Sequence, residues 1–280
     1  MHLFGTRIAI IDFMVSRTIL IFLVAGVCLA QKRDSEFNQL ADRLFDEVVF
    51  RYDPVQGTQA GFHQYDAMLP SGSRAEIEAQ TAALHKFEQE VEGFDARGLT
   101  PATAADRELV LAQIRGQLLS LEVIRPWEKN PDVYSSGVSS AVFVVMSRNF
   151  APAAVRLKSV IAREKLMPRL FQSARENLKN PPRIYTEIAL EQMPGIVSFF
   201  QNDVPAAFKD VSDGALLAEF QQANGAVIDA LHSYEAFLKT DLLPRSQGEF
   251  RIGAETYRKK LLYDEMVDIP LDRLLEIGHI

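Results

Sequence analysis

The sequence predicts an all-α protein, a multi-helix array of long amphipathic helices. Apolar residues recur at three- and four-residue spacings through most of the chain, which is the period of a helix with one buried face. Helix start signals stand before several of these stretches, and only one short passage resembles a strand. With 280 residues, 48% of them hydrophobic, the chain is long enough to bury a sizeable core.

The N-terminus has the layout of a secretory signal peptide. Arg17 precedes an apolar run over residues 18–27, and a short polar stretch begins at Gln31. We therefore expect residues 1–30 to be the signal peptide of an exported protein, periplasmic or extracellular. The apolar run is shorter than the ~20 residues of a membrane-spanning helix, so an uncleaved anchor is the weaker alternative and we expect no integral span after cleavage.

Two features of this N-terminus have alternative interpretations. Met14 competes with Met1 as the start, because Asp12 is out of place in the positively charged part of a signal peptide. Cys28, the only cysteine, would be the acylated residue of a lipoprotein, but Val27 stands where a small residue is normally required. Cleavage at the predicted site would leave a mature chain with no disulfide and no thiol nucleophile.

The first predicted helix carries an apolar stripe over residues 37–49 and ends at Asp53-Pro54. Residues 52–72 contain glycines and prolines without a sustained period, which predicts an ordered connector with a short helical piece. The next helix opens with a capping box, Ser73 with Glu76, and extends to about Gly93.

A third helix is predicted to begin at Thr100-Pro101, a cap residue followed by proline, and to stop at Arg125-Pro126. Residues 138–146 read either as a strand or as a buried helix of small and branched residues. We favour a helix because the flanking segments are helical.

Further helices are predicted over residues 152–178, with Pro168 as a kink or a restart, and over residues 182–200 and 216–238. The last predicted helix follows Pro270. Its apolar stripe has nothing after it that could cover it, which favours a truncated chain. The stripe consists of Leu271, Leu274, Leu275 and Ile277.

The sequence contains no recognisable catalytic or metal-binding motif. No two histidines lie four residues apart, so the HExxH arrangement of helix-borne zinc sites is absent. His85 and His232 each stand among carboxylates, where a solvated helix face is the better interpretation. No GxSxG or phosphate-binding loop is present. The net charge of −7 argues against nucleic acid or an anionic membrane as the partner.

Aromatic and charged residues in turn-rich segments are the best candidates for a ligand-facing cleft wall, because such groups often line clefts. Packing in the core or at helix ends is the alternative for each of them. The candidates are Trp127 with Tyr134, and Arg251 with Glu255 and Tyr257.

Several segments together resemble the N-terminal half of the large bacterial family called domain of unknown function 885. The stretches that carry the resemblance are YDPVQGTQAGFHQYDAMLP (52–70), TP with ADREL (100–109), ENLKNPPRIYTEIA (176–189), LPRSQGEFRIGAETYRKKL (243–261) and IPLDRLLEIG (269–278). Together they cover nearly all of residues 34–280. Their order and spacing, rather than any one motif, make the match specific.

The resemblance implies a helical scaffold that forms one wall of a deep peptide-binding cleft. Proteins of this family are about twice as long and are similar to gluzincin-like, thermolysin-like zinc metallopeptidases. That similarity lies in an HExxxGH-type helix in their C-terminal half. The motif has no counterpart here, so the resemblance implies zinc in full-length members but no cofactor, catalytic residue or metal ligand in this chain.

Two hypotheses about function follow from this reading. In the first, residues 31–280 form a helical domain that is the N-terminal part of a larger, zinc-peptidase-like protein and is inactive alone. In the second, the chain is a stand-alone helical binding or scaffold protein of the periplasm. The uncovered stripe of the last helix favours the first hypothesis.

Overall fold

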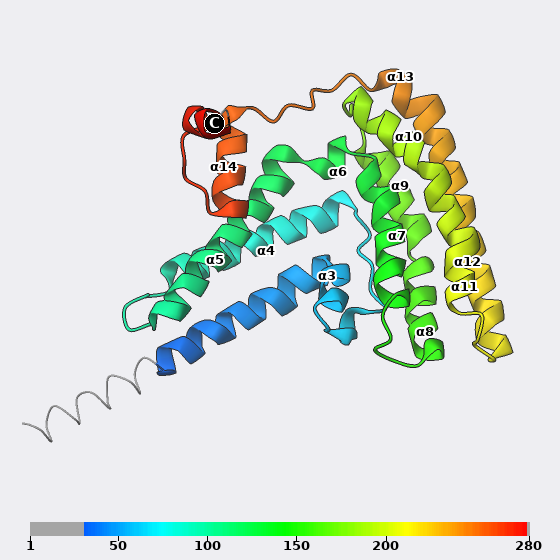
Figure 1. The fold of residues 1–280 in the computed structure, drawn as a ribbon, viewed down its shortest axis with the longest axis horizontal. Coiled ribbons are helices and arrows are strands. Elements are labelled where there is room, and N and C mark those ends of the chain that lie inside the picture. Colours follow the sequence, from blue (N-terminus) through cyan, green and yellow to red (C-terminus); the bar gives the residue numbers. More distant parts are fainter. Residues whose placement is uncertain (1–30, 279–280) are drawn as a thin grey trace, which may run out of the picture.

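The computed structural model describes residues 31–278, and within that range every regular element is a helix (Figure 1). This confirms the predicted all-α class. The helices gather around two separate hydrophobic clusters, and we call the two groups the first lobe and the second lobe. The first lobe comprises residues 31–124 with the returning residues 254–278, and the second comprises residues 126–245.

The predicted signal peptide lies outside the described residues. Within residues 31–278, no helix is both long enough and apolar enough to cross a membrane.

The first lobe begins with a long helix that includes residues 31–44. Short and long elements then follow to residue 124: η1 (Phe45–Val49), α2 (Phe50–Tyr52), α3 (Pro54–Gln59), η2 (His63–Tyr65), α4 (Arg74–Gly93), α5 (Pro101–Leu118) and η3 (Leu119–Ile124). Leu44, Val48, Leu84 and Val91 are fully buried where the first helix meets α4. The connector therefore contains the short helical piece that the sequence predicted.

The predicted helix caps are confirmed, with one difference at α4. Thr100 accepts a bond from the Thr103 N–H, and the Ser73 hydroxyl accepts one from the Glu76 N–H at 3.3 Å. The Glu76 carboxylate, however, accepts from the Gly72 N–H at 2.9 Å instead of from the cap residue's own N–H. Because Gly72 has a φ of +63°, the chain turns there and places its N–H over the carboxylate.

The second lobe is a layer of roughly aligned helices (Figure 1). Its elements are α6 (Pro126–Lys129), α7 (Asp132–Met146), α8 (Ala153–Glu164), α9 (Met167–Asn177), α10 (Arg183–Ser198), η4 (Phe199–Asp203), α11 (Val204–Ala207), α12 (Gly214–Phe237), η5 (Leu238–Leu242) and α13 (Leu243–Arg245). Pro168 lies in the first turn of α9, so it restarts a helix rather than kinking one.

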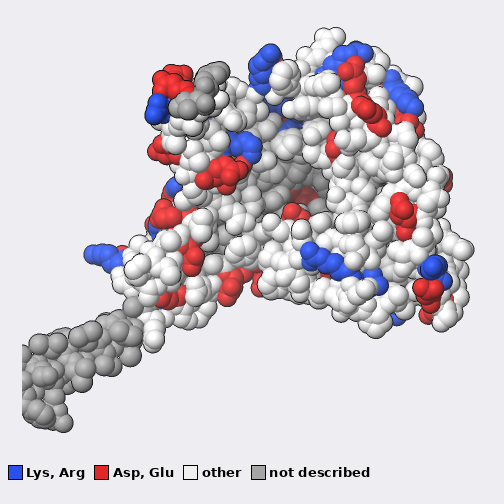
Figure 2. Space-filling model, in the orientation of Figure 1, with Lys and Arg blue, Asp and Glu red and all other residues white. Residues whose placement is uncertain are grey.

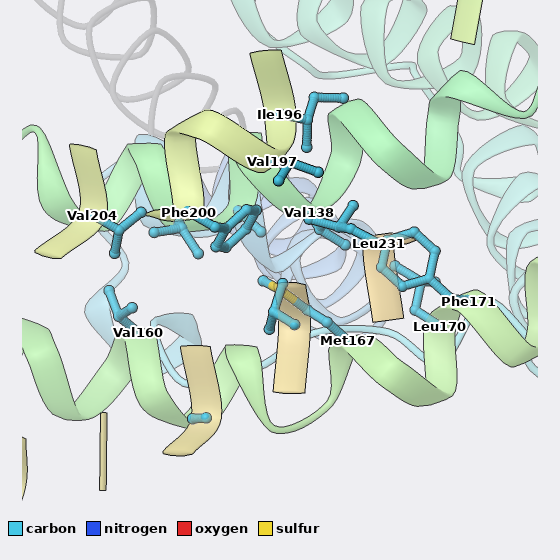
Figure 3. Packing of buried hydrophobic residues seen from close by; sticks show 14 of the residues in the cluster. Val138, Val160, Met167, Leu170, Phe171, Ile196, Val197, Phe200, Val204 and Leu231 are labelled. Atoms are coloured by element: carbon cyan, nitrogen blue, oxygen red, sulfur yellow. The ribbon is translucent and has the colours of Figure 1, made fainter. Parts of the chain in front are cut away.

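The strand-like passage over residues 138–146 is helical, as favoured from the sequence. Val138, Val142 and Val145 are fully buried, and their spacing of four and three residues places them on one face of α7. They join Phe171, Phe200, Leu231 and their neighbours in the larger cluster (Figure 3). Burial against α8 and α10 thus outweighs the β-propensity of the valines.

The C-terminal segment returns to the first lobe. Residues 246–253 cross from α13 to α14 (Ala254–Glu265), which packs on α5 and η3 (Figure 1). The last described helix, α15 (Leu271–Gly278), has no buried residue. Leu275 is 63% exposed and Ile277 is 48% exposed, so part of the predicted apolar stripe faces solvent.

Replacing Leu275 and Ile277 together by Ser should leave the free energy of unfolding within about 0.5 kcal/mol, because neither side chain is buried. Self-association should fall, since exposed apolar patches promote it. Urea denaturation and light scattering would measure both effects. A loss of several kcal/mol would show that this helix is packed within the chain.

Glu164, at the end of α8, is fully buried in the second lobe. Neither carboxylate oxygen has a hydrogen-bond partner among the described residues. Burial disfavours the charged form and raises the pKa of Glu164 to about 8. The side chain is therefore neutral in the folded protein at neutral pH.

Glu164 should make stability depend on pH. Its folded pKa exceeds the unfolded value, so the folded state loses stability as pH rises from about 4.5 to about 8. The loss should be on the order of 4 kcal/mol. Glu164→Gln keeps the shape and should flatten this dependence in urea melts between pH 5 and 8. The matched variant Glu191→Gln, at an exposed position, should keep the pH dependence of the unmodified protein. If stability fell equally with pH in the unmodified protein and both variants, Glu164 would not be the group responsible.

Candidate functional site

A cavity of about 270 Å³ lies between the two lobes, and we call it the inter-lobe pocket. Its walls are mostly apolar and aromatic, as in many ligand-binding sites. The first lobe contributes the residues around Tyr52, Pro54, Leu69 and Ile77, and the second contributes Val133, Tyr134, Gly137 and Leu170. Figure 2 shows the molecule hollowed between the lobes.

A second cavity of about 430 Å³ continues along the exposed side of α7, and we call it the α7–α10 hollow. Val55 lines both cavities. The exposed stripe of α7 links them, because Val133, Gly137, Ser140 and Ser147 follow one another at three- to seven-residue spacings. Val55 and α7 therefore line both cavities, and we refer to the two cavities together as the groove.

Hydrogen bonds fix the aromatic wall of the inter-lobe pocket. The Tyr134 hydroxyl donates to the Trp127 carbonyl at 2.6 Å, and the Trp127 indole donates to the Leu121 carbonyl at 2.9 Å. Asn177 donates to both the Tyr134 hydroxyl and the Gly72 carbonyl, at 3.0 and 2.7 Å. Burial raises the pKa of Tyr134 to about 12, so its hydroxyl remains a donor.

Of the five predicted cleft residues, the structure brings two together. Trp127 and Tyr134 both line the inter-lobe pocket, although Tyr134 is itself nearly buried. Arg251, Glu255 and Tyr257 lie outside both cavities. Arg251 pairs with Glu249 at 3.3 Å, Glu255 pairs with Arg258 at 3.2 Å, and Tyr257 is exposed.

Arg163 links α8 to α7 and to the connector of the first lobe, and the sequence did not identify it. The side chain is fully buried at the end of α8. Its guanidinium donates to the Ala141 carbonyl of α7 at 2.5 Å, to the Pro54 and Tyr65 carbonyls at 3.2 Å, and to the Thr58 hydroxyl at 2.7 Å. One second-lobe side chain thus holds the connector of the first lobe.

Burial lowers the pKa of Arg163 to about 10, and the nearby Asp66 and Asp53 oppose that shift. The guanidinium therefore stays charged at neutral pH. Asp66 is itself buried, and one of its carboxylate oxygens accepts a hydrogen bond from the His63 ring at 3.0 Å. That ring stacks on Phe150, in the loop after α7, with centroids 3.9 Å apart.

The other histidines that the sequence singled out lie on helix surfaces. His85 contacts Glu122 at 2.8 Å, and this hydrogen bond raises its pKa. His232 lies 3.9 Å from Glu235. Within residues 31–278, no three His, Cys, Asp or Glu side chains are grouped as a metal site would require.

Two segments that carry the family resemblance meet beside α10. The Gly248 N–H donates to the Pro181 carbonyl at 3.0 Å, and the Thr186 and Ser246 hydroxyls are 2.8 Å apart. The backbones approach so closely that a Cβ at Gly248 would lie 2.3 Å from the Asn180 carbonyl oxygen. Only glycine fits there, which fixes where residues 246–253 leave the second lobe.

Residues 54–279 match the family described as "Bacterial protein of unknown function (DUF885)". No match is found among curated proteins. Among solved structures, the chain is similar to one described as "a putative lipoprotein of unknown function from Shewanella oneidensis", with a TM-score of 0.78 and 23% sequence identity. The similarity covers 87% of this chain but 45% of that protein, so the chain spans less than half of that protein's length.

Arg163→Met should lower the free energy of unfolding by about 3 kcal/mol, because it leaves buried carbonyl oxygens without donors. Urea denaturation would measure the loss. The matched control Arg169→Met, at an exposed position of α9, should change stability by less than about 0.5 kcal/mol. If both variants lost the same small amount, Arg163 would not hold the lobes together.

Proposed function

Because the chain belongs to the DUF885 family of bacterial proteins, we propose that it forms the peptide-binding, non-catalytic half of a longer zinc-dependent peptidase. The observation that carries this proposal is the groove between the lobes. It combines an apolar, aromatic pocket with a more open hollow that continues along one helix. An extended peptide needs such a site, with pockets for side chains and polar groups for its backbone.

The exposed face of α7 suits a peptide better than a compact ligand. Phe143 is 56% exposed at the α7–α10 hollow, and Val133 is exposed at the inter-lobe pocket. Ser140 and Ser147, also exposed, carry hydroxyls that can bond to a peptide backbone. Apolar anchors alternate with hydroxyl groups along the groove.

A longer protein would provide the catalytic groups. The similar Shewanella protein has more than twice the matched length, and the apolar face of α15 needs a partner surface. We assign the zinc-binding HExxxGH-type helix to that additional half, with its glutamate activating water. In this proposal the described lobes bind and orient the peptide while the zinc site lies elsewhere.

Export is part of the same proposal. The N-terminal sequence has the layout of a signal peptide, and the similar Shewanella protein is described as "a putative lipoprotein", and lipoproteins are a class of exported proteins. A peptidase of this kind would act on peptides outside the cytoplasm.

The test is calorimetric titration of the chain with the pentapeptide Ala-Leu-Phe-Leu-Ala, followed in parallel by fluorescence. Trp127 is the only tryptophan and lines the inter-lobe pocket, so its emission should change with the same saturation curve. Phe143→Asp should weaken binding at least about tenfold, because it removes an apolar anchor and places a charge on the apolar groove. The control Val155→Asp, at a 51% exposed position outside both cavities, should not.

Mass spectrometry of the titrated mixture should recover the peptide intact. Cleavage by the chain alone would contradict the non-catalytic assignment, and the absence of any binding would contradict the peptide-binding role. In the second case the stand-alone scaffold hypothesis would become the better explanation.

A further inference from the structure

The two cavities of the groove carry opposite charges. Asp53 and Glu76 are the charged residues that line the inter-lobe pocket, and Arg148 is the charged residue that lines the α7–α10 hollow. A free peptide also has opposite charges at its two ends. The groove therefore has a polarity that a peptide could match in only one direction.

At the acidic end, each carboxylate has one oxygen engaged by the protein. One Asp53 oxygen accepts from the Gln56 N–H at 3.0 Å. One Glu76 oxygen accepts from the Gly72 N–H and the Ser71 hydroxyl, at 2.9 and 2.8 Å. These bonds hold both carboxylates at the pocket, and their second oxygens have no hydrogen-bond partner in the described part of the chain. An ammonium group is the ligand chemistry that such a pair accepts.

At the basic end, Arg148 is anchored by one guanidinium nitrogen, which donates to the Gln59 carbonyl at 2.6 Å. It makes no ion pair with another residue in the range 31–278. The Ser147 hydroxyl lines the same hollow. The remaining guanidinium donors suit a carboxylate, which arginine binds through two parallel hydrogen bonds.

The length of the groove can be estimated along α7, which lines both cavities. Gly137 at the inter-lobe pocket and Ser147, the C-cap of α7 that lines the α7–α10 hollow next to Arg148, are separated by about 15 Å, at a rise of about 1.5 Å per residue. An extended peptide advances about 3.3 Å per residue, so about five residues span this distance.

On this basis we propose that the groove binds an extended peptide of about five residues in one direction. The amino terminus lies in the inter-lobe pocket beside Asp53 and Glu76, and the carboxylate lies on Arg148. This inference rests on the proposed peptide-binding function and adds the direction and length of the ligand to it.

The experiment titrates the chain with Ala-Leu-Phe-Leu-Ala in three forms: unmodified, acetylated at the amino terminus, and amidated at the carboxyl terminus. Each modification removes one terminal charge and should weaken binding about tenfold, the usual effect of losing a charge-assisted hydrogen bond. The tripeptide Leu-Phe-Leu is too short to reach both ends and should respond to only one modification.

Variants assign each effect to its end of the groove. Arg148→Gln should abolish the sensitivity to amidation and keep the sensitivity to acetylation. The double variant Asp53→Asn with Glu76→Gln should do the reverse, and both replacements keep an oxygen that can accept the existing capping bonds. Circular dichroism melts of both variants would confirm that they fold.

The outcomes separate the two proposals. If Arg148→Gln instead abolished the sensitivity to acetylation, and the double variant the sensitivity to amidation, the peptide would lie in the opposite direction. Equal binding of all three peptide forms would mean that the groove does not recognise termini. Either result overturns the inference while leaving peptide binding intact. If no form of the peptide binds, the proposed function fails together with the inference.

Discussion

The buried guanidinium of Arg163 is the contact on which the arrangement of the lobes depends. A buried charge is costly unless hydrogen-bond acceptors surround it, and here the acceptors come from both lobes. The carbonyl of Ala141 belongs to α7, whereas Pro54, Thr58 and Tyr65 belong to the connector. The hydrogen bonds of this one side chain therefore fix the connector against the second lobe, although the two hydrophobic clusters are separate.

The groove is a consequence of that constraint. Once the connector is fixed, Val55 lies where it lines both cavities, and Asp53 and Glu76 line the inter-lobe pocket. Asn177 makes a second link between the lobes by donating to the Gly72 carbonyl. The crossing over residues 246–253 adds a third connection, which begins where Gly248 packs against Pro181. The site is therefore assembled from segments that are distant in sequence and individually unremarkable in composition.

Helical periodicity and capping residues were enough to predict the fold class and most helix boundaries. The start of α4 after Ser73 and the restart of a helix at Pro168 depend on local chemistry, which a sequence displays directly. The direction of the Glu76 carboxylate was not predictable, because it depends on the turn at Gly72. Trp127 and Tyr134 were expected at a cleft and line one, whereas Arg251, Glu255 and Tyr257 engage local partners or solvent.

Arg163 and Asn177 were missed because their partners are far away in sequence. The bond from Arg163 to Pro54 joins residues 109 positions apart, and that from Asn177 to Gly72 joins residues 105 apart. The available signal was weak: Arg163 and Glu164 lie within four residues of Val160 and Ile161 on α8, and all four side chains are buried. A charged pair on an apolar helix face indicates buried polar contacts but not their partners.

We propose above that the groove beside the segments linked by Arg163 binds a peptide. Nuclear magnetic resonance tests this binding most directly. Trp127 gives the chain a single indole N–H resonance beside the inter-lobe pocket. A pentapeptide with a nitroxide attached near its amino terminus should broaden this resonance strongly, and the same peptide labelled near its carboxyl terminus should broaden it much less. An indole resonance that neither labelled peptide broadens at saturating concentration would contradict the account.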